Sequence, residues 1–124
     1  MLTGNPIAPM LAVSDLGRAR KFYEEVLGFK ATHEDEGGVM YQSGGVTFSV
    51  YPSQFAGTNQ ATAAGFLVPD VVAAKKSLED KGVTFENYDL PDLKTEDGVA
   101  SIGEERTAWF KDPDGNILAL FQMQ

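Results

Sequence analysis

The sequence contains no cysteine and only one histidine, His33, in 124 residues. The absence of thiols excludes disulfides, thiolate nucleophiles, iron–sulfur clusters and cysteine-based zinc sites. Basic residues are also scarce, because ten Lys and Arg stand against 18 Asp and Glu, for a formal charge of -8 and a pI near 4.5. This sign disfavours nucleic acid and anionic membranes as partners, since phosphate recognition needs positive charge.

Long hydrophobic runs are missing as well. No apolar stretch approaches the ~18 residues of a membrane-spanning helix, and the first residues do not form a signal peptide with a basic and then an apolar region. The composition, 43% hydrophobic and 23% charged, is that of an ordinary globular domain. We therefore expect one cytoplasmic domain over residues 1–124.

An internal repeat organises the chain. Asp15 and Asp70 each follow an apolar stretch and precede a helical pattern, and these patterns end at Gly28 and Gly82. Aspartate is a favoured helix N-cap, and glycine readily adopts the left-handed conformation that ends a helix. Strand-like segments follow each helix, at 29–36, 39–43 and 46–51 and then at 83–88, 107–111 and 117–121. Each half therefore predicts a βαβββ module, with module one over about 5–57 and module two over about 61–123.

Two such modules predict an α+β fold. A curved mixed sheet would carry its helices on the convex side and leave a concave face for a ligand. An acidic insertion within 86–106, with seven carboxylates and two basic residues, breaks the symmetry of the two halves. This insertion is either a solvated loop or a flap over the mouth of the pocket.

Several motifs resemble a known superfamily when they are taken in order. They are VSDL at 13–16, KFYEEVLGF at 21–29, FLVPDV at 66–71 followed by Gly82-Val83, and KDPDGN at 111–116. Their order and spacing resemble the vicinal oxygen chelate superfamily, also called the glyoxalase/bleomycin-resistance/dioxygenase group, from Ile7 to Phe121. The resemblance implies the paired βαβββ fold but leaves the chemistry open. The superfamily includes isomerases, epimerases, ring-cleaving dioxygenases, thiol transferases and non-catalytic drug-binding proteins.

In the metalloenzymes of this group, the resemblance implies four metal-ligand positions on the first and last strands of the two modules. These positions fall on Ala8, Ser49, Ala64 and Ala119. Three methyl groups and one neutral hydroxyl cannot hold Zn²⁺, Fe²⁺ or Ni²⁺, and the neighbouring residues are not ligands either. We therefore expect no metal and no other cofactor.

Strand alternation predicts which side chains share the face of these positions, because residues two apart point to the same side. The candidate ligand-binding residues are Met10, Thr47, Ser49, Tyr51, Phe66, Trp109 and Phe121. Trp109 and Phe110 are adjacent, so one faces the core and the other faces the ligand side or a subunit interface. The alternative is that these side chains simply fill the concave face as a packed core.

The favoured functional hypothesis is a metal-free homodimer that binds a small organic molecule, either a drug or an aromatic or cationic metabolite. It follows the resemblance to the bleomycin-resistance type, which sequesters its ligand. One alternative is a metal-independent lyase or isomerase with Tyr51, Ser49 or His33 as proton carriers. Another is a non-catalytic interaction or regulatory module. The sequence assigns no catalytic residue.

Overall fold

The computed structural model describes residues 2–123 and contains two mixed four-stranded sheets. Sheet A has the order β1-β4-β3-β2, with β1 at Met10–Val13, β2 at Ala31–Asp35, β3 at Gly38–Ser43 and β4 at Val46–Pro52. Sheet B has the order β5-β10-β9-β8, with β5 at Thr62–Leu67, β8 at Val99–Ile102, β9 at Glu105–Lys111 and β10 at Ile117–Met123. In each sheet the strand that comes first in the sequence pairs parallel with the strand that comes last, β1 with β4 and β5 with β10. The other pairs are antiparallel. The predicted α+β class and the repeat of one topology are confirmed.

The helices begin where the sequence predicts. Asp15 caps α1 (Leu16–Arg20) and Asp70 caps α2 (Val71–Glu79), each side chain accepting a hydrogen bond from a backbone N–H of the first turn. α1 continues directly into a π-helical segment, η2 (Lys21–Val26), with wider turns than an α-helix. The glycines that follow the two helical patterns have φ of +85° and +92°, the left-handed conformation that ends a helix. In the described part of the chain, no helix is long and apolar enough to cross a membrane.

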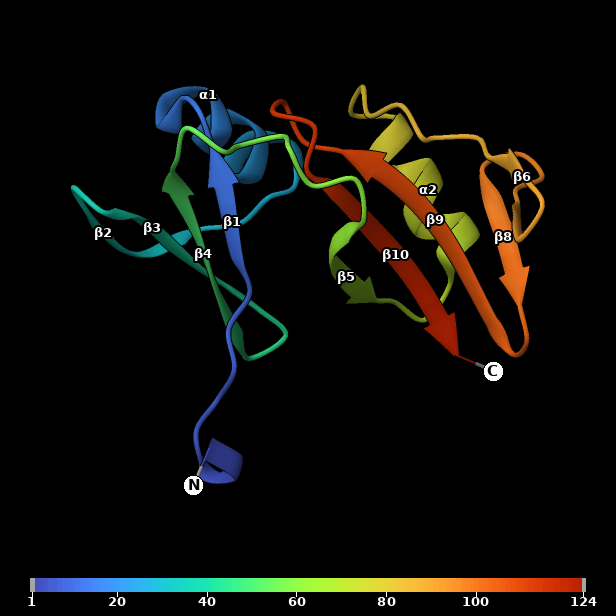
Figure 1. Ribbon diagram of the computed structural model, residues 1–124, viewed down its shortest axis with the longest axis horizontal. Coiled ribbons are helices and arrows are strands. Elements are labelled where there is room, and N and C mark those ends of the chain that lie inside the picture. Colours follow the sequence, from blue (N-terminus) through green and yellow to red (C-terminus); the bar gives the residue numbers. More distant parts are fainter. Residues whose placement is uncertain (1, 124) are drawn as a thin grey trace.

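The two modules lie side by side and share one core. Figure 1 shows α2 behind β9 and β10, and α1 at the end of β1. The helix-facing sides of both sheets form one hydrophobic cluster. The largest fully buried side chains of this cluster come from both modules and include Tyr23, Tyr41, Phe110 and Leu118. The core therefore fixes the two sheets relative to each other.

The prediction of a strand over 83–88 is wrong. Phe85 makes a single antiparallel bridge to Phe110, and the backbone N–H of Glu86 donates to Trp109 O at 2.8 Å. Farther along β9, the neighbouring strand is β8. Residues 87–98 lie between the bridge at Phe85 and strand β8 and leave the sheet there. They carry a short hairpin of β6 (Asp89–Leu90) and β7 (Leu93–Lys94). We call residues 87–98 the excursion.

The predicted face of β5 is also wrong. Thr62 pairs with Ile117, but a register shift follows, after which Phe66 pairs with Leu120 and Gly65 pairs with Ala119. Residues paired in register share a face of the sheet. Phe66 therefore lies on the core side of sheet B, whereas simple alternation places it with Ala119. An irregularity of this kind shifts the inside and outside positions of a strand by one residue.

Candidate ligand-binding site

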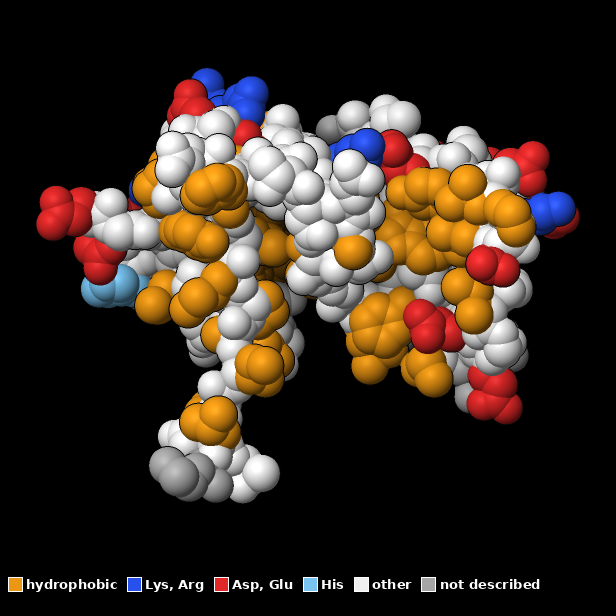
Figure 2. Space-filling model, in the orientation of Figure 1, with side chains coloured by type: hydrophobic (Ala, Val, Ile, Leu, Met, Phe, Trp, Pro, Cys, Tyr) orange, Lys and Arg blue, Asp and Glu red, His pale blue; other side chains and the backbone are white. Residues whose placement is uncertain are grey.

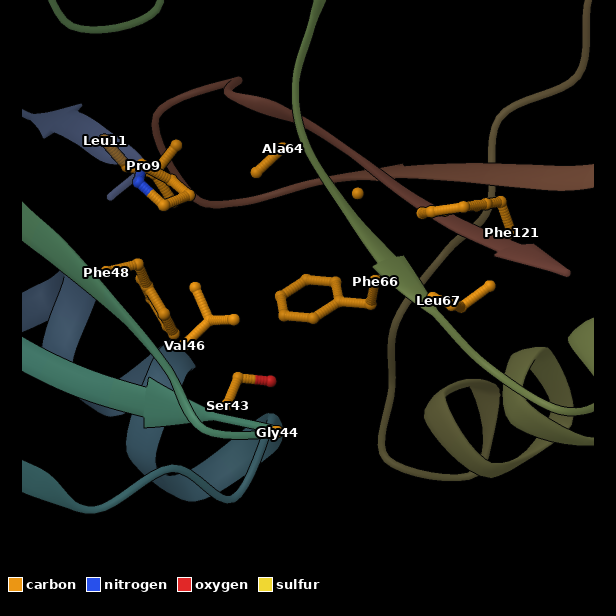
Figure 3. A pocket seen from close by; sticks show the side chains of 11 residues that line it. Pro9, Leu11, Ser43, Gly44, Val46, Phe48, Ala64, Phe66, Leu67 and Phe121 are labelled. Carbon is orange, nitrogen blue, oxygen red and sulfur yellow. The ribbon is translucent and has the colours of Figure 1, made fainter. Parts of the chain in front are cut away.

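A cavity of about 410 Å³ lies between the two modules. Figure 3 shows β1, β4 and the turn after β3 on one side, and β5 with Phe121 of β10 on the other. The lining residues are Pro9, Leu11, Ser43, Gly44, Val46, Phe48, Ala64, Gly65, Phe66, Leu67 and Phe121. Among them, Ser43 has the only polar side chain and none is charged. Small-molecule sites in proteins have volumes of about 300–1,000 Å³ and mostly apolar walls, so this intermodule cavity has the size and lining of one.

Phe66 is the centre of the aromatic wall of this cavity. Its ring stacks on Phe29 with centroids 5.8 Å apart and meets Phe48 edge-on at 6.5 Å. Phe66 also lines a second cavity of about 340 Å³ on the helix side, together with Leu78 and Phe110. The candidate ligand residue Phe66 is thus placed at a cavity, although from the core side of its sheet.

The open face of sheet A carries the four candidate residues of module one. Met10 pairs with Ser49 across β1 and β4, so these two side chains share a face, and Thr47 and Tyr51 lie two residues from Ser49 on the same strand. Met10 is 69% exposed and Tyr51 is 37% exposed. The predicted alternation is confirmed here. None of these four residues lines the intermodule cavity, to which β1 and β4 contribute Leu11 and Phe48 from the opposite face of the sheet.

The corresponding face of sheet B is covered by the chain itself. Trp109 and Ala119 pair in register on this face, yet they are only 8% and 3% exposed. Tyr88 and Leu93 of the excursion pack against them, and the Tyr88 ring meets the Trp109 ring edge-on at 5.5 Å. The indole N–H of Trp109 donates to Thr62 Oγ1 at 3.1 Å. The acidic insertion is therefore a cover on sheet B rather than a freely solvated loop.

This arrangement resolves two open expectations. Of the adjacent pair in β9, Phe110 lies in the main core at 0% exposure and Trp109 faces the excursion. Phe121 shares the face of Trp109, because it pairs with Thr107 of β9, and its ring also lines the intermodule cavity. The alternative that these side chains form a packed core therefore describes the outer face of sheet B, which the excursion covers. The space between the modules, in contrast, is an open cavity.

His33 lies on the edge strand β2 with its side chain 58% exposed. Its Nε2 is 3.1 Å from Asp35 Oδ2. His33, Met40 and Ser49 form a row across β2, β3 and β4, and together with Asp35 they line a hollow of about 130 Å³. Two strand spacings place His33 roughly 10 Å from Ser49. A nucleophilic triad needs a direct contact between base and nucleophile, and this separation excludes it in the described conformation.

The donor set does not fit a divalent metal. Ala8, Ser49 and Ala119 offer no imidazole or carboxylate, and the register of β5 places Gly65 rather than Ala64 beside Ala119. Among residues 2–123, no three or more His, Asp and Glu side chains are grouped so that they could hold a metal ion. Structural and catalytic metal sites use three or four such ligands. No reaction step at this site is therefore assigned to a metal.

The turn between β9 and β10 holds the modules in place around the cavity. Asn116 Nδ2 donates to the backbone oxygen of Ala12 in β1 at 2.7 Å. Arg18 of α1 forms an ion pair of 2.9 Å with Asp114, whose carboxylate also accepts a hydrogen bond from Ser14. These contacts join residues about a hundred positions apart in the sequence. The sequence motif KDPDGN is thus a structural link between the modules.

Comparisons with known proteins agree with this geometry. A family model described as Glyoxalase/Bleomycin resistance protein/Dioxygenase superfamily matches residues 5–120. Among curated proteins, none matches this sequence. A glyoxalase family protein from Enterococcus faecalis superposes with a TM-score of 0.74 at 20% identity, over 98% of this chain and 99% of that one.

Two further solved structures with similar folds have different descriptions. A lactoylglutathione lyase from Agrobacterium tumefaciens has a TM-score of 0.68 at 19% identity, over 95% of this chain and 93% of its own. The fosfomycin resistance protein FosX from Listeria monocytogenes has a TM-score of 0.70 at 14% identity, over 95% and 92%. At these identities the similarity establishes the fold and not the activity.

Proposed function

The chain belongs to the Glyoxalase/Bleomycin resistance protein/Dioxygenase superfamily, and from that premise we propose that it binds a small aromatic molecule, neutral or cationic, in the intermodule cavity without a metal. The observation that carries the proposal is the lining of that cavity. Ten of its 11 residues are apolar or glycine, and the remaining one is Ser43. Such a wall holds a ligand by burial of apolar surface and by shape, with one hydroxyl at the turn for orientation.

The magnitude of apolar burial sets the expected affinity. A ligand of two or three fused rings that buries about 300 Å² of apolar surface gains roughly 7 kcal/mol before the entropic costs of association. The rings of Phe48 and Phe66 offer edge and face contacts to such a ligand, which add about 1–2 kcal/mol. An association cost of at least about 4 kcal/mol leaves roughly 4–5 kcal/mol, which corresponds to a Kd of about 0.2–1 mM.

The preference for cations comes from the whole protein and not from the cavity wall. The chain has a formal charge of -8, whereas none of the cavity's lining side chains is charged. A negative field raises the local concentration of cations near the protein, while the apolar cavity favours an uncharged ring. A ligand with a ring in the cavity and a cationic group at its mouth satisfies both conditions. Sequestration of a drug with these two features is a use of this kind.

The experiment is a thermal-shift screen with neutral, cationic and anionic aromatic compounds on three proteins. Val46 lines the cavity and is 50% exposed, whereas Val72 lies on α2 at 49% exposure. Val46→Asp and Val72→Asp therefore add the same charge at equally exposed positions. A neutral aromatic ligand at ten times its Kd is expected to raise the Tm of the wild type and of Val72→Asp by about 5 °C, and that of Val46→Asp much less. The proposal is wrong if no neutral or cationic compound stabilises the wild type, or if Val46→Asp responds to the neutral ligand like the wild type.

A metal-independent lyase or isomerase is the second candidate function. It is favoured by one observation, the hollow that His33, Asp35 and Ser49 share on the open face of sheet A, near Tyr51. An imidazole paired with a carboxylate is a competent proton carrier, and the hydroxyls would orient a carbonyl substrate. The triple variant His33→Ala, Ser49→Ala, Tyr51→Phe is expected to lose turnover of any substrate that the wild type converts. Unchanged turnover would eliminate this candidate.

A further inference from the structure

Strand β5 brings its backbone to the intermodule cavity as well as its side chains. Four consecutive residues of the strand, 64–67, line that cavity. Consecutive residues of a strand point to opposite faces of its sheet, so a surface that touches all four runs along the edge of the strand. β5 is an edge strand of sheet B, and among residues 2–123 no strand pairs with its outer side. The cavity therefore follows an open strand edge.

The hydrogen-bonding pattern fixes which amides face this edge. Val68 N donates to Phe121 O at 2.8 Å, so Val68 directs its amide groups to β10. In a parallel ladder this direction alternates along the strand, and the register with β10 is regular after the shift near the start of β5. Phe66 is therefore turned toward β10 like Val68, whereas Gly65 and Leu67 direct their N–H and C=O groups to the open edge. The cavity wall thus holds polar groups that its side chains do not provide.

This edge lacks the features that protect many edge strands. Proteins keep strand edges from pairing with other chains by placing charges or prolines on them. β2, an edge strand of sheet A, carries His33, Glu34 and Asp35, and Figure 2 shows acidic side chains gathered at that end of the molecule. Strand β5 has the sequence TAAGFL, with no charge and no proline. Its open edge is therefore suited to pair with another amide.

Aromatic rings flank the same edge on both faces of the sheet. Phe66 lies on the core side, and Figure 3 shows it reaching toward Phe48 of module one, with ring centroids 6.5 Å apart. On the other face, ring atoms of Phe121 lie 3.2 Å from the position that a Cβ on Gly65 would take. A glycine inside a strand often marks a place where another backbone approaches closely. The edge thus offers hydrogen bonds in the plane of the sheet and aromatic contacts above and below it.

We infer that the ligand of the intermodule cavity is peptide-like, a secondary amide with an aromatic side group that pairs with the edge of β5 as a short added strand. In a parallel arrangement, one residue of the ligand donates its N–H to Gly65 O and accepts a hydrogen bond from Leu67 N through its C=O. That residue pairs with Phe66, so its side group lies on the face of Phe66 and Phe48. The inference rests on the proposed function, since it names the class of molecule that fills the same cavity.

The amide follows from the cost of covering the edge. A purely apolar molecule in the cavity removes water from the Gly65 and Leu67 amides and gives them no partner, whereas a ligand amide replaces that water with hydrogen bonds. Each replaced hydrogen bond favours the amide by roughly tenfold in affinity. The side chains of the lining carry no charge, so a neutral amide matches this wall better than a carboxylate does.

Two small probes test the inference on the wild type by NMR titration. N-acetyl-phenylalanine methylamide carries one residue with the required donor and acceptor. Its analogue with a methyl group on the phenylalanine nitrogen keeps the ring and both carbonyls but lacks the donor to Gly65. The first probe is expected to bind roughly ten times more tightly, to shift the amide proton of Leu67 downfield and to slow its exchange with solvent.

Equal affinities of the two probes, or a Leu67 amide that neither probe affects, overturn the inference. A Leu67 amide that is already protected from exchange in the protein alone overturns it as well, because the edge is then paired without a ligand.

A proline at position 67 removes the matching donor from the protein. Proline is tolerated on an edge strand where the missing N–H points away from the ladder, so Leu67→Pro is expected to keep the pairing of β5 with β10. Leu67→Ala is the matched control, because it shortens the side chain and keeps the N–H. Leu67→Pro is expected to bind N-acetyl-phenylalanine methylamide roughly ten times more weakly than Leu67→Ala does. Equal binding by the two variants refutes the edge pairing.

Toluene separates this inference from the proposed function, because it carries the same ring without an amide. Toluene is expected to bind both variants alike. If toluene binds the wild type while the two amide probes bind equally, the inference is wrong and the apolar cavity remains a ligand site. If none of the three compounds binds the wild type, the inference and the proposed function are both wrong.

Discussion

The hydroxyl of Tyr23 in module one donates a hydrogen bond of 2.9 Å to Asp112 Oδ2 in module two, across 89 residues of sequence. Both residues are buried, at 0% and 4% exposure. Asp112 also accepts hydrogen bonds from the backbone N–H groups of Asp114 and Asn116 and from the Asn116 side chain. Burial, and secondly the neighbouring Asp112 carboxylate, raise the pKa of Tyr23. The phenol therefore remains a donor, and the pair joins the modules from inside the core.

Tyr23→Phe tests this link. The variant keeps the ring in the core but leaves a buried carboxylate with one donor fewer, which costs about 1–3 kcal/mol of unfolding free energy. Tyr41→Phe is the matched control, because its hydroxyl donates to the partly exposed Glu24 at 2.8 Å and its loss is expected to cost less. Urea unfolding at neutral pH measures both. A loss in Tyr23→Phe no larger than that in Tyr41→Phe contradicts a special role for the buried pair.

Glu24 predicts a pH dependence of stability. Its carboxylate accepts hydrogen bonds from Arg20 Nε at 2.6 Å and from the Tyr41 hydroxyl. The hydrogen bond from Arg20, more than that from Tyr41, lowers the pKa of Glu24 below its ordinary value, although partial burial opposes the shift. A carboxyl with a lower pKa in the folded state stabilises the fold above its unfolded pKa, and this contribution is lost as pH falls through the folded pKa.

The free energy of unfolding is therefore expected to decrease between about pH 5 and pH 3, and more steeply in the wild type than in Glu24→Gln. Glu25→Gln, at the neighbouring exposed position, is expected to follow the wild type. Urea unfolding at several pH values measures the slopes. Parallel curves for the wild type and Glu24→Gln would show that the network contributes nothing to the acid response.

Local signals in the sequence predicted the parts of the fold that depend on local physics. The caps Asp15 and Asp70 were predictable because an N-cap acts on the next three residues. The shared face of Met10, Ser49 and Tyr51 was predictable because β1 and β4 are regular. Module repetition followed from these signals, whereas the four metal-ligand positions were implied only by the resemblance to the superfamily.

The remaining features depend on long-range contacts. The register shift in β5 moves Phe66 to the core side, and no local pattern marks it, because Ala63, Ala64 and Gly65 are small residues suited to either face. The excursion is a second case. Its acidic composition indicates solvent, yet Tyr88 and Leu93 cover Trp109 and Ala119. The aromatic residue and the leucine within the acidic run were the available signal, and their partners lie across the sheet.

Leu93→Asp tests the covering role of the excursion. Trp109 is the only tryptophan and is 8% exposed beneath Tyr88 and Leu93, so its fluorescence reports the cover directly. A carboxylate at position 93 is expected to lift the excursion, shift the emission of Trp109 to the red and increase its quenching by acrylamide. The control is Leu90→Asp in the same hairpin, where the side chain is already 51% exposed. Equal quenching in the two variants would mean that Leu93 does not shield the indole.

Salt separates the two contributions to ligand binding that the structure suggests. The cavity wall is uncharged while the whole chain carries -8, so the ring of a ligand is held by apolar contacts and its cationic group only by the surrounding field. Raising salt from 20 mM to 500 mM shortens the screening length from about 20 Å to about 4 Å. The affinity of a cationic aromatic ligand is therefore expected to fall roughly three- to tenfold, whereas that of a neutral ligand with the same ring changes less than about twofold.

Titration calorimetry at the two salt concentrations measures both affinities. An equal change for the two ligands would place the cationic group outside the protein field.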